Sequence, residues 1–158
     1  MSVRSSKRVV LVCACAALIV SATAGAAKIP IAGRDALTGK RVALTQFPGK
    51  PVFVNVWGSW CTGCNEEAPT LARFARAHKR QVAFFGIDTE DSKAGARAFY
   101  ERFDTDYPSI WDPRGIVAGA WSRGTPTTLV FDRRHVLVQR IEGTASLAEL
   151  NKALRRVT

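Results

Sequence analysis

Hydrophobic and polar positions follow two kinds of pattern in this chain, short apolar runs and longer segments with helical spacing. Residues 52–57 (VFVNVW) and 81–87 (QVAFFGI) are rich in β-branched and aromatic side chains, which predicts two buried strands. Between them, apolar residues recur every three or four positions from Ala68 to Ala75, and this spacing predicts a helix. The same spacing predicts a second helix over residues 92–103.

The last third of the chain predicts a strand pair and a final helix. Residues 107–110 form a short extended piece, and residues 127–131 and 136–141 are strands on either side of a turn. Ser146 and Glu149 have the spacing of a capping box, which marks the start of a helix. Three leucines are expected on its buried face: Leu147, Leu150 and Leu154.

The order of these elements predicts an α/β domain. Strands separated by helices favour parallel pairing in one central sheet, and the closing strand pair adds an antiparallel edge. Residues 35–44 are expected to contribute a leading strand or hairpin. With 158 residues, 47% of them hydrophobic, the chain has the size and composition of one globular domain.

The N-terminus has the charge, apolar core and small-residue order of a secretory signal peptide. Basic residues between Arg4 and Arg8 precede an uncharged run over residues 9–27. We expect residues 1–27 to be cleaved, which leaves residues 28–158 as the folded domain. The alternative is a signal anchor, because the uncharged run is long enough to span a bilayer. Both outcomes predict an exported protein, periplasmic or otherwise extracytoplasmic, and the second adds a membrane tether through residues 9–27.

The net charge of +10 comes from scattered basic residues. They occur singly or in short pairs such as Lys79–Arg80 and Arg133–Arg134, without a dense run that includes aromatic residues. This distribution predicts a solvated basic surface and no nucleic-acid interface. A dedicated site for an anionic partner is the alternative.

Cys61 and Cys64 are the two of four cysteines that lie outside the N-terminal segment. A disulfide between them would restrain little of the unfolded chain, because the entropic benefit grows with loop length. We therefore interpret them as a redox pair. They lie between the first strand and the first helix, where free backbone N–H groups and the helix dipole favour a thiolate. Cys61 is expected to be the exposed attacking thiolate, and Cys64 the thiol that resolves the mixed disulfide.

The residues around this pair resemble a thioredoxin-fold active site. The sequence from Trp60 to Cys64 (WCTGC) is similar to the redox motif, and residues 124–127 (GTPT) resemble the loop that places a cis-proline opposite the cysteines. Pro69 stands where thioredoxins have the proline that kinks the active-site helix.

Two further residues resemble the TlpA/ResA-like branch of exported thiol–disulfide oxidoreductases. Asn55 occupies the strand position where thioredoxin has a buried aspartate, and Glu67 follows Cys64 by three residues. The resemblance implies a thioredoxin fold, with a central mixed β-sheet flanked by helices and the extra βα insertion typical of this branch. Gly63 departs from the pattern because many relatives have proline there, so the redox potential cannot be carried over.

The resemblance also implies roles for individual residues. Cys61 and Cys64 are catalytic, and Glu67 relays a proton to or from Cys64. The alternative for Glu67 is an acidic residue in the first helical turn that the dipole stabilises. Trp60 and Thr125–Pro126 are expected to bind substrate, with Pro126 docking an extended backbone beside Cys61.

Four aromatic or imidazole side chains have simpler interpretations. Trp57 and Trp111 are expected in the core. His78 and His135 lie far apart in the sequence, whereas a zinc pattern places histidines about three to five residues apart. No metal site and no cofactor are expected.

The function implied by the resemblance is an enzyme that reduces protein disulfides outside the cytoplasm, with cytochrome c maturation as one pathway. Its partners would be protein disulfides and dithiols together with a membrane thiol protein that donates electrons, and it would act as a monomer. One alternative is an oxidase that introduces disulfides. Another, from a different class, is a non-catalytic metallochaperone that holds copper(I) between the two cysteines.

Overall fold

A five-stranded mixed sheet forms the centre of the computed structural model, which describes residues 29–158. Its strand order is β5-β4-β3-β6-β7. The strands are β3 (Val52–Trp57), β4 (Ala83–Thr89), β5 (Ser109–Asp112), β6 (Thr127–Phe131) and β7 (Leu137–Glu142). β4 is parallel to β3 and β5, whereas β6 is antiparallel to β3 and β7. The mixed sheet predicted from the sequence is therefore confirmed, and the expected signal segment, residues 1–27, lies outside the described residues.

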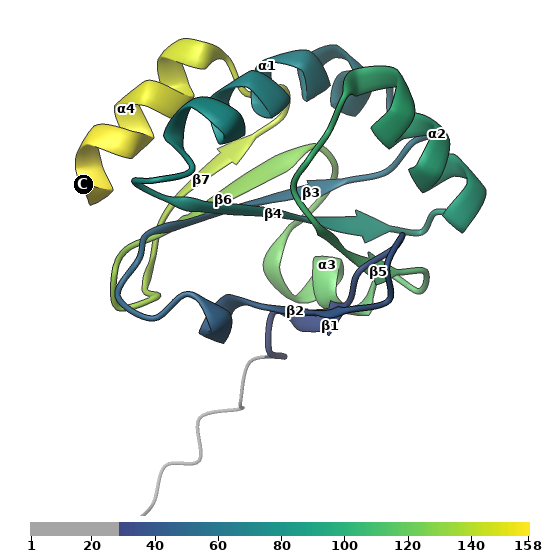
Figure 1. Ribbon diagram of the computed structural model, residues 1–158, viewed down its shortest axis with the longest axis horizontal. Helices are drawn as coiled ribbons and strands as arrows, with labels where there is room; N and C mark the ends of the chain where they lie inside the picture. The colour runs from purple at the N-terminus through teal and green to yellow at the C-terminus, as the bar shows by residue number, and fades with distance from the viewer. Residues whose placement is uncertain (1–28) are drawn as a thin grey trace, which may run out of the picture.

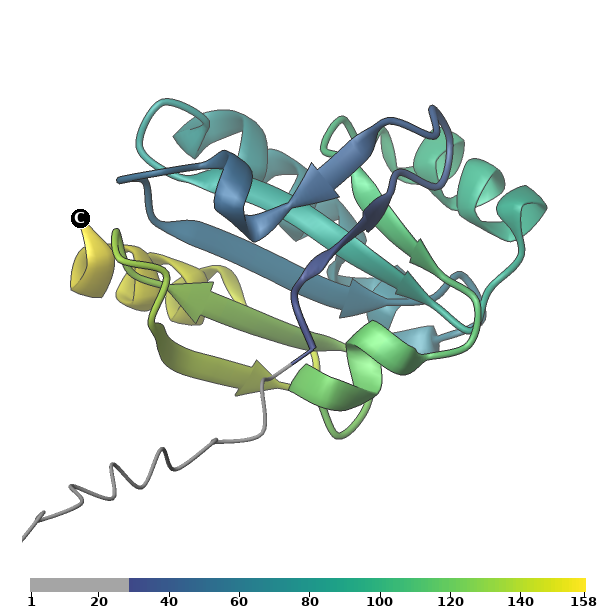
Figure 2. The same cartoon turned by 90° about the horizontal axis from the view of Figure 1, so that it is seen from below.

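Helices cover both faces of this sheet. Three of them lie on one face: α1 (Thr62–His78), α2 (Lys93–Phe103) and α4 (Leu147–Val157). The other face carries the short helix α3 (Ile116–Trp121) and the antiparallel hairpin of β1 (Ala32–Arg34) and β2 (Arg41–Ala43), as Figures 1 and 2 show. A 3-10 turn (Leu44–Gln46) follows β2. Among residues 29–158, no helix has the length and apolar character needed to cross a membrane.

The central strand β3 is buried on both faces, which explains its uninterrupted apolar run. Phe53 packs into the cluster beneath α1 and α4, together with Phe74 and Leu150. Val54 points the other way, into the cluster that includes Ile87. The alternating side chains of one strand thus contribute to two cores.

Two hydrophobic residues are more exposed than the sequence predicts. Leu147 is 53% exposed because it is the first residue of α4, while Leu150 and Leu154 form the buried face. Trp111 is 36% exposed because β5 is an edge strand, and the Lys93 ammonium lies 4.6 Å from the centre of its ring. The predicted core position of Trp111 is therefore wrong, whereas that of Trp57, 1% exposed, is confirmed.

Helix α3 was not predicted, because a contact outside the helix stabilises its start. Gly115 precedes it with a φ of 64°, and the Asp112 carboxylate accepts hydrogen bonds from the backbone N–H groups of Ile116 and Ala118. Such a cap satisfies N–H groups that have no partner inside the helix. Its six residues are too few to show a helical period.

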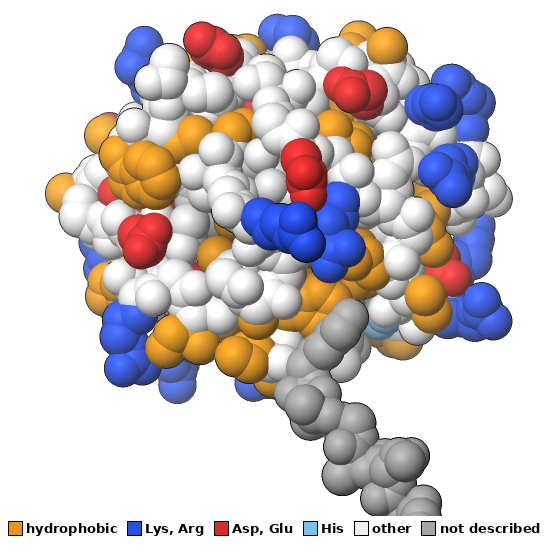
Figure 3. Space-filling view, turned by 180° about the vertical axis from the view of Figure 1, so that it is seen from behind, with side chains coloured by type: hydrophobic (Ala, Val, Ile, Leu, Met, Phe, Trp, Pro, Cys, Tyr) orange, Lys and Arg blue, Asp and Glu red, His pale blue; other side chains and the backbone are white. Residues whose placement is uncertain are grey.

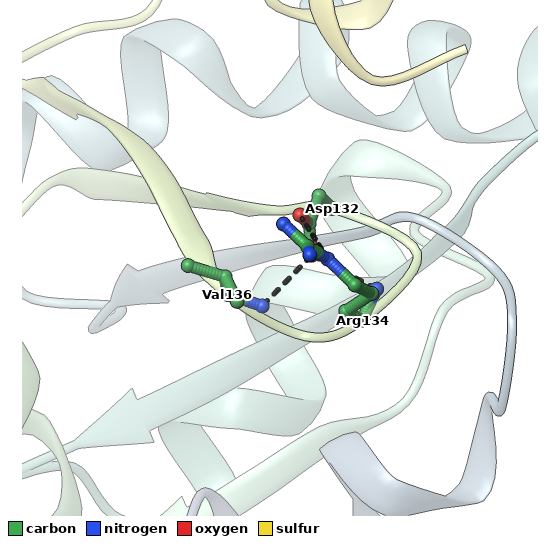
Figure 4. Close-up of polar contacts among 3 residues, drawn as sticks. All are labelled: Asp132, Arg134 and Val136. Carbon is green, nitrogen blue, oxygen red and sulfur yellow. Dashed lines mark hydrogen bonds and ion pairs between the residues drawn. The ribbon is translucent and has the colours of Figure 1, made fainter.

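The turn between β6 and β7 contains the predicted turn residues. The Asp132 carboxylate accepts hydrogen bonds from the backbone N–H groups of Val136 and Arg134, both 2.9 Å (Figure 4). These bonds, that of Val136 first, hold the pKa of Asp132 below its usual value. His135 adopts a φ of 60° in the same turn, which reverses the chain into β7.

Candidate active site

Cys61 and Cys64 are joined by a disulfide at the N-terminus of α1. Cys61 is the N-cap residue, and its Sγ accepts the backbone N–H of Cys64 at 3.2 Å. In the reduced state the same N–H groups would stabilise a thiolate on Cys61. The residue exposures are 6% for Cys61 and 1% for Cys64. Cys61 is the more open of the two, although it is less exposed than predicted.

Hydrogen bonds hold the loop before the cysteines in place. Ser59 donates from its backbone N and its Oγ to the Asp91 carboxylate, at 2.6 and 2.9 Å. The Asn65 side-chain amide donates to the carbonyls of Ser59 and Cys61. The backbone N–H of Cys61 donates to the Gly58 carbonyl. The position of Cys61 therefore depends on contacts with α1 and with the segment after β4.

Trp60 covers the surface next to Cys61. It is 56% exposed, and its Nε1 donates to the Thr89 carbonyl at 3.3 Å. A Cβ on Gly58 would lie 2.5 Å from that Nε1, so the indole packs directly on the Gly58 backbone. More than half of this side chain is therefore open to solvent beside Cys61.

The loop before β6 lies against the turn between the two cysteines. Its Thr125–Pro126 peptide bond is cis, as the resemblance implied. A Cβ on Gly63 would lie 3.2 Å from Pro126 Cδ and 3.0 Å from Thr144 Oγ1. The close approach of these two residues gives a structural reason for glycine at position 63, where many relatives have proline.

Asn55 and Glu67 form one buried polar network beneath the site. The Asn55 side-chain amide donates to Glu67 Oε1 at 2.8 Å and to Thr128 Oγ1 at 3.3 Å. The second carboxylate oxygen, Oε2, accepts the backbone N–H of Ala145 at 2.6 Å. Both Asn55 and Glu67 are 2% exposed. The sequence identified both residues but not the direct contact between them.

Burial raises the pKa of Glu67 to about 7, although the hydrogen bonds from Ala145 and Asn55 lower it in part. The side chain can therefore gain or lose a proton near neutral pH. No acidic residue lies in the first turn of α1, and Glu67 is on the next turn, facing the core. The alternative interpretation, an acid held by the helix dipole in the first turn, is therefore wrong.

Asp88 is a second buried carboxyl group, which the sequence analysis did not identify. It is fully buried in β4, beside Trp57 of β3, and neither oxygen has a hydrogen-bond partner among the described residues. Burial raises its pKa to about 8, and the nearby carboxylates of Asp91 and Asp112 contribute to the rise. The only signal of this buried group in the sequence is the position of Asp88, an acidic residue directly after the apolar run of residues 81–87.

The two histidines lie on separate elements. His78 ends α1 and packs on Phe74, with ring centres 4.6 Å apart. His135 lies in the turn after β6, with its Nε2 2.9 Å from the Phe47 carbonyl oxygen. Within residues 29–158, no group of three or more His, Cys, Asp or Glu side chains could hold a metal ion.

Comparisons with known proteins agree on one family. A family model described as Redoxin matches residues 24–154. Thiol-disulfide oxidoreductase ResA of Geobacillus kaustophilus is 30% identical over 123 residues, which are 77% of this chain and 71% of that protein. Thioredoxin-like protein YneN of Bacillus subtilis is 28% identical over 121 residues, 75% of this chain and 71% of that protein.

Solved structures share the fold. A secreted thiol-disulfide isomerase from Corynebacterium glutamicum is 27% identical with a TM-score of 0.74, over 82% of this chain and 84% of that chain. MTB DsbF has a TM-score of 0.75 over 83% of this chain and 97% of that chain. Because DsbF is 21% identical, that likeness shows the fold alone.

Proposed function

Because the chain belongs to the TlpA/ResA-like thiol–disulfide oxidoreductases of the Redoxin family, we propose that it is exported and reduces disulfides of other exported proteins through Cys61 and Cys64. The thioredoxin fold predicted from the sequence is confirmed. Helix α2 and strand β5 are proposed to be the extra unit expected of this branch. The chain is an enzyme of thiol–disulfide exchange. What we propose is the direction, reduction of substrate disulfides.

The observation that carries this proposal is the disulfide at the start of α1, with its more open sulfur on Cys61 and its buried one on Cys64. In the reduced enzyme, the Cys61 thiolate attacks one sulfur of a substrate disulfide and releases the other as a thiolate, which takes up a proton. Cys64 then loses its proton and attacks Cys61 Sγ. This step releases the second substrate thiol and forms the Cys61–Cys64 disulfide, so two electrons have passed to the substrate.

Glu67 is proposed to accept the proton that Cys64 loses. It lies on the helical turn after Cys64, and its pKa of about 7 leaves it partly ionised at neutral pH. The hydrogen bonds from Asn55 and Ala145 hold the carboxylate in place. Glu67 acts through Cys64 and does not touch substrate.

Substrate is proposed to bind along Trp60 and the Thr125–Pro126 loop. Neither the N–H nor the C=O of Thr125 has a hydrogen-bond partner among the described residues. An extended substrate segment could pair with both groups and place its sulfur at Cys61. The exposed indole of Trp60 offers apolar contact on the other side.

Several features of the cellular setting belong to the same proposal. The sequence of residues 1–27 supports export, with cleavage or a tether through residues 9–27 as the two outcomes. A membrane thiol protein would return electrons to the Cys61–Cys64 disulfide. The enzyme would act as a monomer, and apocytochrome c is one proposed substrate.

The direction of electron flow has a direct test. We expect the protein to reduce insulin disulfides and to have a potential nearer to thioredoxin, about −270 mV, than to DsbA, about −120 mV. We also expect the pair to be mostly reduced in cells. A mostly oxidised pair that accelerates disulfide formation would instead favour the oxidase. Tight binding of one copper(I) ion without insulin reduction would favour the metallochaperone.

Replacing Glu67 by Gln should slow exchange by about tenfold or more, because glutamine cannot accept a proton. In the unchanged protein the rate should rise with pH through about 7, as the Glu67 carboxyl group ionises. The variant should lose this rise. The measurement is the pH profile of the exchange rate together with the titration of the Cys64 thiol.

The matched control is Glu66→Gln, which removes the same charge from an exposed neighbour on the same helix. It should keep both the rate and the pH profile. Unchanged thiol titration and exchange rates in the Glu67→Gln protein would show that Glu67 has no proton-transfer role.

A further inference from the structure

A groove of about 270 Å³ lies beside Trp60. Its walls are the indole of Trp60, the turn at Thr89–Glu90, the start of α3 at Gly115, and residues 122–125, which lead into Pro126. The groove therefore adjoins the two elements proposed to hold substrate at Cys61. A polypeptide bound there would continue from the reactive cysteine into the groove.

Two arginines line the groove without protein partners. Arg114 and Arg123 make no hydrogen bond or ion pair with any other residue in the part of the chain that the structure describes. Glu90 contributes the one carboxylate in the lining, so the groove carries a net positive charge. The carboxylates of Asp91 and Asp112 lie outside the lining, where Asp91 accepts hydrogen bonds from Ser59 and Asp112 caps α3.

Basic side chains also gather beyond the groove. A second hollow, of about 480 Å³, shares Gly119, Ser122 and Arg123 with it and adds Arg140 and Glu142. Figure 3, which views the molecule from behind Figure 1, shows Lys and Arg side chains close together near the centre of that face, with an acidic side chain against them. A segment that leaves the groove past Arg123 would therefore meet one further arginine, Arg140, and one carboxylate, Glu142.

We propose that this groove selects polypeptide substrates with acidic residues next to the reactive cysteine. This inference rests on the proposed function and names the substrate class of the same site. Arginine suits the task because its planar guanidinium can donate two parallel hydrogen bonds to one carboxylate. Trp60 and the backbone of Thr125 position the segment, while Arg114 and Arg123 determine which sequences bind well. The scattered basic residues of the sequence left a dedicated site for an anionic partner as an alternative to a solvated basic surface. In this proposal, that site is the groove.

The effect should be moderate and sensitive to salt. Ion pairs at exposed positions are weak, so two of them should favour an acidic substrate over a neutral one by about tenfold. Salt screens such pairs, and the preference should shrink markedly at about 1 M salt. A preference based on shape alone would not change with salt.

Three peptide disulfides of equal length test the inference. In them the reactive cysteine is flanked by two Glu, two Gln or two Lys residues, and the readout is kcat/KM for reduction by the dithiol form of the protein. We expect the Glu peptide to react fastest and the Lys peptide slowest. The variant Arg114→Gln/Arg123→Gln should reduce all three at rates similar to that of the Gln peptide.

The control variant Arg80→Gln/Arg155→Gln changes the net charge equally. Arg80 follows α1 and Arg155 is near the end of α4, and neither residue lines the groove. The control should keep the preference for the Glu peptide. Its loss in the control would mean that net charge, and not the groove, selects the substrate, which would overturn the inference.

Two further outcomes separate this inference from the function on which it rests. Equal rates for all three peptides would overturn the acidic preference and leave disulfide reduction intact. No reaction with any peptide would overturn the proposed function and the inference together. A dependence on Arg114 and Arg123 that appears with glutathione disulfide, but with none of the peptides, would overturn the assignment of a polypeptide ligand.

Discussion

Replacing Cys64 by Ser should convert the enzyme into a trap that stays covalently bound to its substrates. Cys61 remains able to attack a substrate disulfide, but the buried thiol that would release the mixed disulfide is gone. Turnover should therefore stop after one attack. Non-reducing electrophoresis and mass spectrometry of the trapped species would measure this and identify the physiological substrates.

Replacing Cys61 by Ser should abolish turnover without trapping anything. Cys64 is 1% exposed, so a substrate sulfur cannot approach it in line while the surrounding helix is intact. The double variant Cys61→Ser/Cys64→Ser is the control and should form no covalent complexes. Trapping by Cys61→Ser in place of Cys64→Ser would reverse the assigned roles of attacking and resolving cysteine.

Replacing Asp88 by Asn should make the protein more stable than the unchanged chain at alkaline pH. The folded state holds a proton on Asp88 up to a pKa of about 8, whereas the unfolded chain releases it near the ordinary aspartate pKa of 3.8. Stability therefore falls as pH rises between these two values, because over this range the folded state binds more protons than the unfolded state. Above about pH 8 the full loss of folding stability, at most roughly 6 kcal/mol, is present.

The Asp88→Asn variant should lose most of this fall in folding stability with rising pH. Glu67 causes stability to fall in the same way, between the ordinary glutamate pKa of 4.5 and its raised pKa of about 7, and the variant keeps that part of the decline. Urea unfolding between about pH 4 and pH 9 measures the difference. At the acid end the variant should gain nothing, since an unpaired buried amide also carries a cost.

Asp106→Asn provides the matched control for this experiment. Asp106 is exposed, so the same chemical change should leave the dependence of stability on pH unaltered. Parallel stability curves for the unchanged protein and the Asp88→Asn variant would contradict the assignment of a buried proton to Asp88.

The sequence predicted the elements whose causes are local. The apolar run of β3, the helical spacing of α1 and the capping box of Ser146 and Glu149 each act within a few residues, and the structure contains all three. The position of the two cysteines was also predictable from local sequence, because they lie between a predicted strand and a predicted helix and so at a helix N-terminus. The cis bond at Pro126 was accessible through the family resemblance alone.

The sequence did not predict two features of the structure, for different reasons. Helix α3 has only six residues, and it is capped by Asp112, the last residue of strand β5. Trp111 is apolar, yet it is partly exposed because β5 is the edge of the sheet. An apolar pattern indicates which residues can be buried, but the position of a strand in the sheet decides whether they are.

The sequence by itself determined the redox pair, its place between strand and helix, and the residues Asn55, Glu67 and Pro126 that accompany it. Only the tertiary structure joined Asn55 to Glu67 and placed Arg114 and Arg123 in one groove beside Trp60. It also buried Asp88 where no residue among 29–158 forms a hydrogen bond to its carboxyl group. The reason is physical. Thiol chemistry and helix capping act over one helical turn, whereas burial, pKa and charge around a groove depend on segments that meet only after folding.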